Sequence, residues 1–327
     1  MAETINIAKM AEKLSKEMFA EFLWKRMAPT NVNWPCEDQD AHNVKTHPSD
    51  VVFYYDEPYT QARTYINTDL KSYAKGSITV GAIRSAIESL ARSLACAEKS
   101  EEFRTKFLHE HVSPDICGLL FVYNHDGEYD KDFSGLLGQV KNEKLDIPTK
   151  SKIVVFGPRD IFWLNNVHHE IAYMRGGGGI LPDREHCKYF YPHLVRRKNV
   201  QLEHATAATL EMLTAPWVIL SYVNPKKQNR KGFVIFYRKR GESAEEFLYL
   251  IDYLMHYQVL VDETDIYLKT LDAHPNASAF FDKAKDQYVE EYEGGPDIRD
   301  RLNTIEFAQI NDVRTKFSDA ELSRQDV

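Results

Sequence analysis

Two acidic residues and one lysine lie at the ends of two neighbouring predicted strands. Asp50 precedes the apolar run at residues 51–56, and Asp69 and Lys71 close the run at residues 62–71. Side chains alternate along a strand, so Asp69 and Lys71 share one face. Asp69-Leu70-Lys71 is the only (Asp/Glu)-x-Lys triplet in the sequence. Two carboxylates and an ammonium on adjacent strands are the groups needed to hold a divalent cation beside a phosphodiester.

A further acid, Glu21, lies on the apolar stripe of a predicted N-terminal helix over residues 6–27. Apolar residues recur there at three- and four-residue spacing. Glu21 follows Leu14 by seven residues, so at 100° per residue it lies about 20° from that side chain. A buried carboxylate is costly without a partner. Two interpretations stay open: a Glu whose stem lies along apolar surface, or an acid directed at a metal site.

The elements that would position these residues follow in a simple order. Residues 28–49 form a loop with room for one short strand, and the hairpin at 51–56 and 62–71 has Pro58 in its turn. A regular apolar stripe predicts a helix over residues 78–98. Short apolar runs at residues 116–123 and 153–156 predict two buried strands.

This order of elements, with acids at these positions, resembles the PD-(D/E)XK superfamily of restriction-endonuclease-like phosphodiesterases. The resemblance covers residues 1–125 and extends toward residue 175. It implies a restriction-endonuclease-like mixed α/β sheet flanked by helices, in a domain over residues 1–180. Asp69 stands where Glu is commoner in the family. The first acid is also ambiguous, because Asp56 and Glu57 lie at the far end of the strand that Asp50 opens.

The resemblance also implies a chemistry, namely a Mg²⁺- or Mn²⁺-dependent deoxyribonuclease of prokaryotic restriction or anti-phage defence. Asp50, Asp69 and the backbone carbonyl of Leu70 would bind the metal, with Glu21 as an outer or second-metal ligand. Lys71 would orient the attacking water or stabilise the transition-state charge. A non-catalytic scaffold subunit that binds nucleic acid or a partner protein is the alternative. For Asp69 and Lys71 alone, the plain alternative is an exposed ion pair on a strand.

A basic segment at residues 225–240 stands out in a chain with a net charge of −8. It contains seven cations and no acid, in the order Lys226, Lys227, Arg230, Lys231, Arg238, Lys239 and Arg240. Predicted strands at 217–223 and 233–237 make it a β-hairpin with a basic tip and base, which suits a phosphate backbone. The alternative is a solvated turn that protects a sheet edge. A shorter basic run lies at residues 196–198.

The cysteine and histidine spacings do not match a familiar metal motif. The four cysteines, Cys36, Cys96, Cys117 and Cys187, contain no Cys-x₂-Cys pair, so we expect reduced, buried thiols. A zinc interpretation is also open to His168-His169, Glu185-His186-Cys187 and His193, but no pair among them has HExxH or Cys-x₂-Cys spacing. We expect the histidines to be ordinary structural residues.

The remaining sequence, residues 181–327, predicts an accessory α/β domain for target selection or partner docking. Helices are expected at residues 202–213, 244–257 and 280–291, and Ser243 with Glu246 fits a capping box. The last thirty residues are polar with a weak helical signal.

Length and composition agree with a folded cytosolic protein. The chain has 327 residues, of which 43% are hydrophobic, enough for a sizeable core. No apolar run reaches about 18 residues, and the N-terminus lacks a signal-peptide pattern, so we expect no membrane span and a cytoplasmic location. The acidic net charge does not exclude DNA, since bases can gather on one face. A partner subunit or homo-oligomer is compatible with all of these features.

Overall fold

The computed structural model describes residues 2–60, 62–141, 147–148, 151–177, 179–192, 205–261, 264–292 and 296–312. The chain divides into two compact units that meet in sequence between Phe162 and Trp163. The division falls inside helix α6 (Pro158–Arg175). The proposed domain boundary at residues 180 and 181 stays a prediction, and each unit is described by itself.

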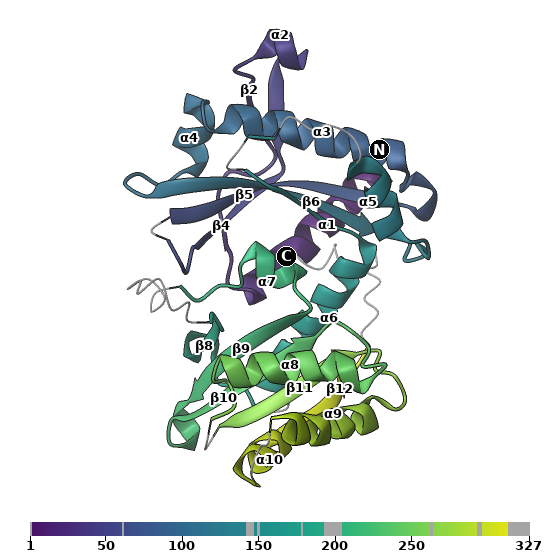
Figure 1. Ribbon diagram of the computed structural model, residues 1–327. Helices are drawn as coiled ribbons and strands as arrows, with labels where there is room; N and C mark the ends of the chain where they lie inside the picture. The colour runs from purple at the N-terminus through teal and green to yellow at the C-terminus, as the bar shows by residue number, and fades with distance from the viewer. Residues whose placement is uncertain are drawn as a thin grey trace. The chain divides into compact units, whose positions relative to one another are not determined.

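The first unit is built on a mixed five-stranded sheet in the order β1-β4-β5-β6-β7 (Figure 1). Its strands are β1 (Lys25–Arg26), β4 (Val51–Asp56), β5 (Ala62–Tyr73), β6 (Ser113–Asn124) and β7 (Ile153–Phe156). β4 runs antiparallel to β1 and β5, whereas β5, β6 and β7 are parallel. The predicted hairpin and the buried strand β6 are confirmed, and the predicted strand β7 is present but only half-buried except at Phe156.

Helices cover both faces of this sheet, as the buried side chains show. Leu120 and Val122 of β6 pack in the core that contains the apolar stripe of α3 (Val80–Ala97). Phe121 points the other way, and its ring lies 5.9 Å from that of Phe19 in α1 (Ala2–Glu21). α1 and α3 therefore lie on opposite faces, as Figure 1 shows.

The N-terminal helix ends at Glu21 rather than at the expected residue 27. Leu23 adopts a left-handed backbone with φ of 64°. The amide of Leu23 donates to the carbonyl of Ala20, and the amide of Trp24 donates to that of Phe19. The rings of Phe19 and Trp24 stack at 4.4 Å. These features make a Schellman motif with Leu in the usual glycine position, which frees residues 25–26 to pair as β1.

Residues 28–49 contain more structure than the sequence predicted. β2 (Val32–Pro35) pairs with β3 (Thr46–Ser49) in an antiparallel two-stranded sheet, and the short helix α2 (Gln39–His42) connects them. Trp34 anchors this hairpin, because it is fully buried and donates to the Ser49 hydroxyl at 2.9 Å. The first unit is completed by η1 (Lys75–Ser77), α4 (Glu101–Phe107) and α5 (Phe133–Lys141).

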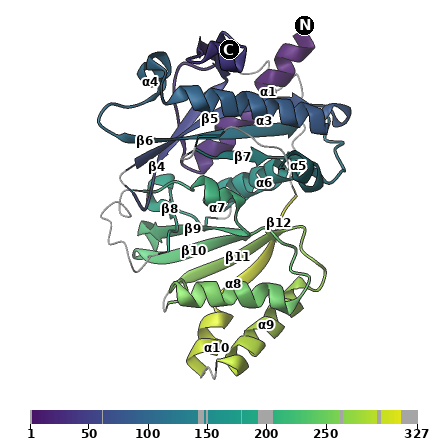
Figure 2. The same cartoon turned by 45° about the horizontal axis from the view of Figure 1, so that its top comes forward.

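The second unit has its own five-stranded sheet, in the order β12-β11-β10-β9-β8. Its strands are β8 (Cys187–Tyr189), β9 (Trp217–Asn224), β10 (Arg230–Tyr237), β11 (Asp265–Leu271) and β12 (Ile305–Ile310). Strands β8 to β10 are antiparallel, and β10 to β12 are parallel. The helical elements are η2 (Arg184–His186), α7 (Leu210–Thr214), η4 (Pro225–Lys227), α8 (Ala244–His256), α9 (Ala277–Glu291) and α10 (Pro296–Asn303). Figure 2 shows α8 next to β11, with α9 and α10 beyond α8.

Most of the second unit follows the sequence prediction, but β8, α7, α10 and β12 differ from it. Ser243 caps α8 through a hydrogen bond from the Glu246 amide, as the capping box predicts. The helix predicted at 202–213 is reduced to α7, while residues 201–204 lie outside the described residues. The polar C-terminal segment, which carries only a weak helical signal in the sequence, contains α10 and also the edge strand β12, which was not predicted. The α/β class, with a mixed sheet flanked by helices and a second C-terminal sheet, is confirmed.

Candidate functional site

Asp50 lies between the accessory hairpin and the main sheet of the first unit. It directly follows β3 and precedes β4. Its backbone carbonyl accepts a hydrogen bond from the Asn31 amide at 2.8 Å. Its carboxylate accepts one from the Leu70 amide at 2.7 Å. Asp50 is thus held from both sides by backbone groups, which fixes the carboxylate against the middle of the (Asp/Glu)-x-Lys triplet.

Asp69 and Lys71 are on one face of β5 and form an ion pair. Lys71 Nζ lies 2.6 Å from Asp69 Oδ1, and the side chains are 33% and 16% exposed, respectively. In the parallel register, Asp69 pairs with Leu120 and Lys71 with Val122. Leu120 and Val122 pack toward α3. Asp69 and Lys71 therefore also project from the face of the sheet that α3 covers.

The two carboxylates interact with each other. The pKa of Asp50 is raised to about 6, chiefly by burial, and the charge of Asp69 and a side-chain hydrogen bond with it raise the pKa further. The Leu70 amide and Lys71 oppose that shift. For Lys71, burial favours the neutral amine, but the charges of Asp69 and Asp50 outweigh burial and raise the pKa. Lys71 is therefore a cation in this arrangement.

This geometry brings together three of the predicted site residues, Asp50, Asp69 and Lys71. Two ionised carboxylates in contact repel one another, and one ammonium cannot balance both. Carboxylate oxygens are hard ligands of the kind that Mg²⁺ and Mn²⁺ prefer. The donor set therefore fits a divalent cation. Leu70 contacts Asp50 through its amide, and the proposed metal contact of its carbonyl stays a prediction.

Glu21 is the last residue of α1, and its side chain is buried at 4% exposure, as its place on the apolar stripe predicted. α1 contacts β5, the strand of Asp69 and Lys71. However, α1 packs on the face opposite to the one from which those two side chains project. A role for Glu21 as an outer metal ligand stays a prediction.

The ambiguity between Asp50 and the acids at the other end of β4 is resolved by their contacts. Asp56 pairs with Arg63 at 2.7 Å, and Glu57 accepts a hydrogen bond from Thr64. In the antiparallel register Asp56 is opposite Arg63, whereas Val51 is opposite Thr68. Asp50 is consequently the acid that lies beside Asp69.

Tyr73 is a residue of this site that sequence reasoning missed. It lies two positions beyond Lys71 on β5, and therefore on the same face. Burial raises the pKa of its hydroxyl, and the charges of Lys71 and Asp69 both act on it. The signal was available in the two-residue periodicity, which continues from Asp69 through Lys71 to Tyr73.

The predicted basic hairpin of the second unit is present, and its cations are not equivalent. β9 and β10 pair in antiparallel fashion, with η4 at the turn. Lys226, Lys227 and Lys231 are exposed at the tip, and within the described part of the chain no ion pair engages them. Arg230 instead forms an ion pair with Asp265 at 2.7 Å.

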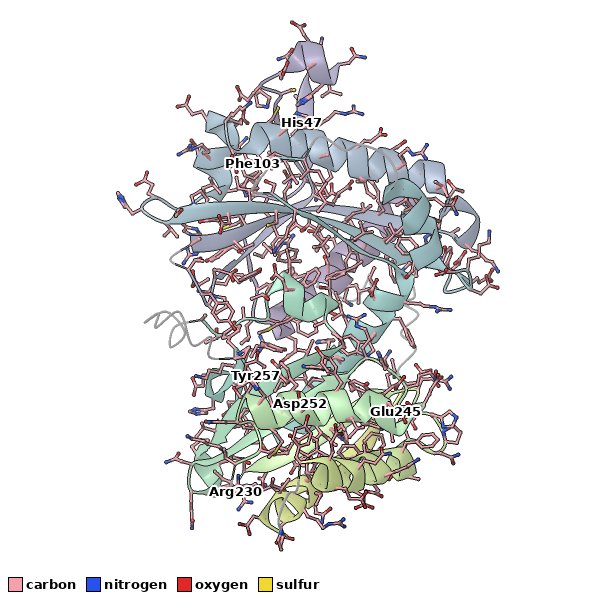
Figure 3. All side chains as sticks on the ribbon, viewed as in Figure 1. His47, Phe103, Arg230, Glu245, Asp252 and Tyr257 are labelled. Atoms are coloured by element: carbon pink, nitrogen blue, oxygen red, sulfur yellow. The ribbon has the colours of Figure 1, made fainter. Side chains whose placement is uncertain are left out.

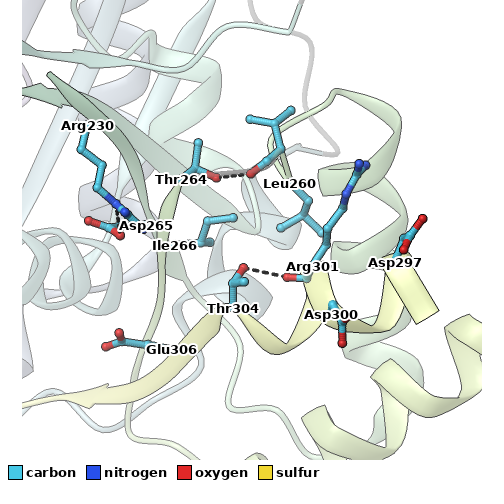
Figure 4. Close-up of a pocket in the computed structure, with 11 residues that line it drawn as sticks. Arg230, Leu260, Thr264, Asp265, Ile266, Asp297, Asp300, Arg301, Thr304 and Glu306 are labelled. Carbon is cyan, nitrogen blue, oxygen red and sulfur yellow. Dashed lines mark hydrogen bonds and ion pairs between the residues drawn. The ribbon is translucent and has the colours of Figure 1, made fainter. Parts of the chain in front are cut away.

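Arg230 and Asp265 also line a pocket of about 640 Å³ in the second unit (Figure 4). Four acids contribute to its wall, Asp265, Asp297, Asp300 and Glu306. An acidic surrounding disfavours phosphate, so the tip lysines are better candidates for nucleic-acid contact than Arg230.

The remaining cations lie at the other end of β10. Eight residues separate Arg230 from Arg238, or roughly 26 Å along a strand. Arg238 donates to the Leu213 carbonyl at 2.6 Å and stacks 4.2 Å from the Trp163 ring. Arg240 pairs with Glu242 and Asp272, whereas Lys239 is exposed. The basic run at residues 196–198 lies outside the described residues.

Among the helices of the described chain, none combines the length and the apolar character that a membrane crossing requires. Residues 1–160 match the family model described as the GAPS4 protein PD-(D/E)XK nuclease domain. No curated protein and no solved structure matches the chain. The matched range contains the whole Asp50, Asp69 and Lys71 arrangement, and the N-terminal half of this chain is a domain of the PD-(D/E)XK nuclease superfamily.

Proposed function

We propose that the first unit is an active deoxyribonuclease that uses Mg²⁺ or Mn²⁺. The single observation that carries this proposal is the contact of the Asp50 and Asp69 carboxylates beside the Lys71 ammonium. Nucleases of this superfamily generally use divalent metals. The matched family is associated with defence, which supports restriction or anti-phage defence as the process.

Each residue has a distinct task in this proposal. Asp50 and Asp69 bind the cation through their oxygens, and the Leu70 amide fixes the orientation of Asp50. Lys71, kept protonated by the same acids, stabilises negative charge on the phosphoryl oxygens in the transition state. The bound metal supplies Lewis-acid activation of the phosphodiester and of water.

The proposal is tested by incubating the purified full chain with plasmid and with linear DNA, in buffer with and without added Mg²⁺. We expect cleavage only with the cation, and loss of cleavage in Asp69→Asn. Asp56→Asn is the matched control, because Asp56 is an acid of the same hairpin that pairs with Arg63. Cleavage by Asp69→Asn at the wild-type rate would overturn the mechanism. Binding of DNA without cleavage would favour the non-catalytic scaffold.

We further propose that the tip lysines of the β9–β10 hairpin help to hold the DNA. Two observations support this: these lysines are exposed, and no acid among the described residues forms an ion pair with them. Contacts of this kind act on phosphates and do not read sequence. A partner protein or a second copy of the chain is expected only under the alternative, in which the first unit is a non-catalytic scaffold.

A further inference from the structure

Four potential metal ligands converge in the first unit, far from one another in sequence. They are Cys36, which follows β2, His42 at the end of α2, His47 in β3 and Cys96 in α3. Their four ligand atoms all lie within 4.8 Å of one another. Figure 3 shows His47 beside α3, and β3 contacts that helix. The hairpin of residues 32–49 is thus attached to α3 through these side chains.

The distances within the cluster suit one tetrahedral ion. Cys36 Sγ and Cys96 Sγ are 3.8 Å apart, and His42 Nδ1 lies 3.3 Å and 3.4 Å from them, respectively. With bonds of about 2.3 Å to sulfur and about 2.0–2.1 Å to nitrogen, a tetrahedral zinc ion places two sulfurs about 3.8 Å apart. The same geometry places sulfur and nitrogen roughly 3.5–3.6 Å apart. The observed separations are within a few tenths of an ångström of these values.

An independent observation concerns His47. The residue is 2% exposed, and its Nε2 is buried with no hydrogen-bond partner among the residues that the structure describes. A buried ring nitrogen without a partner loses its hydration and gains nothing in return. A cation coordinated by His47 would supply the missing partner for the lone pair of Nε2.

Burial and the neighbouring Cys36 raise the pKa of the Cys96 thiol, and the backbone amides of Glu37 and Asp38 partly oppose that shift. Amide donors stabilise negative charge on sulfur, as outer-sphere groups do around metal-bound ligands. Cys36 and Cys96 are also 4% and 1% exposed, respectively, so the sulfurs are shielded from water.

We propose that Cys36, His42, His47 and Cys96 bind one structural zinc ion. Two thiolates and two imidazoles form a donor set that selects zinc over Mg²⁺, which prefers oxygen. Four protein ligands leave no open position, so the site stabilises structure and does no chemistry. It is separate from the oxygen-lined Asp50 and Asp69 site and does not depend on the nuclease proposal.

The ion would add a second attachment for the hairpin of residues 32–49, beside the one that buried Trp34 provides. α2 has no buried residue, and β2 and β3 form a sheet of only two strands. Such a hairpin is marginal by itself in water. Metal binding contributes directly to folding when the ligands come together only in the native state.

The test begins with metal analysis of the full chain, expressed without a metal-binding tag and purified in metal-free buffer. We expect about one zinc per chain by elemental mass spectrometry. Replacement by Co²⁺ should give the intense visible bands of a tetrahedral site and thiolate charge-transfer bands in the near ultraviolet. Either stoichiometric zinc or stoichiometric Co²⁺ with these bands supports the proposal. Neither metal bound by folded protein, or iron with acid-labile sulfide, would overturn it.

Variants separate the cluster from the other thiols. Cys96→Ser should lose the metal, whereas the control Cys117→Ser, a buried cysteine of β6, should keep it. If Cys96→Ser does not fold, His42→Ala provides the second variant, because His42 is only half-buried. A folded His42→Ala protein with an unchanged Co²⁺ spectrum and zinc content would exclude His42 and with it the proposed quartet.

Discussion

The Lys71 ammonium lies 2.6 Å from the Asp69 carboxylate, two residues earlier on the same strand and the same face. Because Asp69 also contacts Asp50, one cation faces two acids. When both acids are ionised the site carries a net negative charge of one. That excess makes the site attractive to a divalent ion and costly to maintain without one.

Lys71→Ala should slow cleavage with little effect on folding. Removal of a single group that stabilises transition-state charge typically costs about 10²–10³ in rate. Single-turnover cleavage at saturating Mg²⁺ and DNA measures this effect, and circular dichroism checks the fold. A rate within about twofold of wild type would show that Lys71 only pairs with Asp69, as an exposed ion pair of a strand does.

Asp50→Asn should abolish cleavage and at the same time stabilise the metal-free protein. The raised pKa, about 6 against 3.8, means that the ionised Asp50 opposes folding at pH 8. A shift of about two units corresponds to at most about 3 kcal/mol, and Asn keeps an acceptor for the Leu70 amide. Urea unfolding in metal-free buffer measures the change.

The control for that stability change is Asp56→Asn. Asp56 pairs with Arg63 near the surface, so its loss should lower the free energy of unfolding by about 0–1 kcal/mol. A higher free energy of unfolding for Asp50→Asn and a lower one for Asp56→Asn would identify Asp50 as the acid whose ionised form opposes folding. A destabilised Asp50→Asn protein would contradict the raised pKa of Asp50.

The pH dependence follows from the same group. The native state of the metal-free protein binds an extra proton between pH 3.8 and about 6, so the Asp50 contribution to the free energy of unfolding decreases as pH rises through that window. Metal binding needs the ionised form, and the apparent affinity for Mg²⁺ should therefore weaken as pH falls below about 6. Mg²⁺ titrations of the cleavage rate between pH 5 and pH 8 test this, and a flat affinity would contradict it.

The double variant Lys226→Ala/Lys227→Ala should weaken DNA binding and flatten its salt dependence. Each lost phosphate contact lowers the log–log slope by roughly 0.9 on duplex DNA, so the pair should lower it by about 1.8. Fluorescence anisotropy on a labelled duplex at several salt concentrations gives both quantities.

The control for that test replaces Lys99 and Lys283, which are two exposed lysines outside the hairpin. Lys99→Ala/Lys283→Ala removes the same charge from the chain. Equal losses in the two double variants would mean that net charge, rather than the hairpin, sets the affinity. An unchanged slope in the hairpin variant would leave the hairpin as a solvated edge.

Gly118→Ala should destabilise the first unit by about 1–3 kcal/mol. A Cβ at Gly118 would lie 3.0 Å from side-chain atoms of Leu90 and Leu94, where β6 packs against α3. Gly138→Ala is the control, because a Cβ in that helix meets nothing within 4 Å. That control should be stabilising by up to about 1 kcal/mol. Thermal unfolding distinguishes the two.

The parts of the site that are close in sequence were predictable. Strand alternation alone places Asp69 and Lys71 on one face, and the hairpin brings Asp50 to them. Element boundaries that depend on a single backbone conformation were not predictable. The helix over residues 6–27 ends early because Leu23 adopts a left-handed φ, which no pattern of apolar residues reveals.

The Cys36, His42, His47 and Cys96 cluster escaped the sequence for a different reason. Its spacing matches no short motif, and Cys96 reaches the others only because α3 lies against the β2–β3 hairpin. β12 was missed because only its two end residues, Ile305 and Ile310, are buried, and its pairing with β11 is what makes it a strand. In both cases tertiary contacts, rather than local periodicity, decide the outcome.

Only Pro48 and Ser49 lie between His47 and Asp50, and Ser49 is fastened to Trp34. A chelator such as EDTA would therefore act twice on this short run of chain. It would remove a loosely held Mg²⁺, which returns on replenishment, and extract a thiolate-bound ion, after which β3, the strand that leads into Asp50, loses one of its attachments. Oxidation of Cys36 or Cys96 would have the second effect alone, and cleavage by the proposed site would then depend on redox conditions through β3, which contributes none of the proposed catalytic residues.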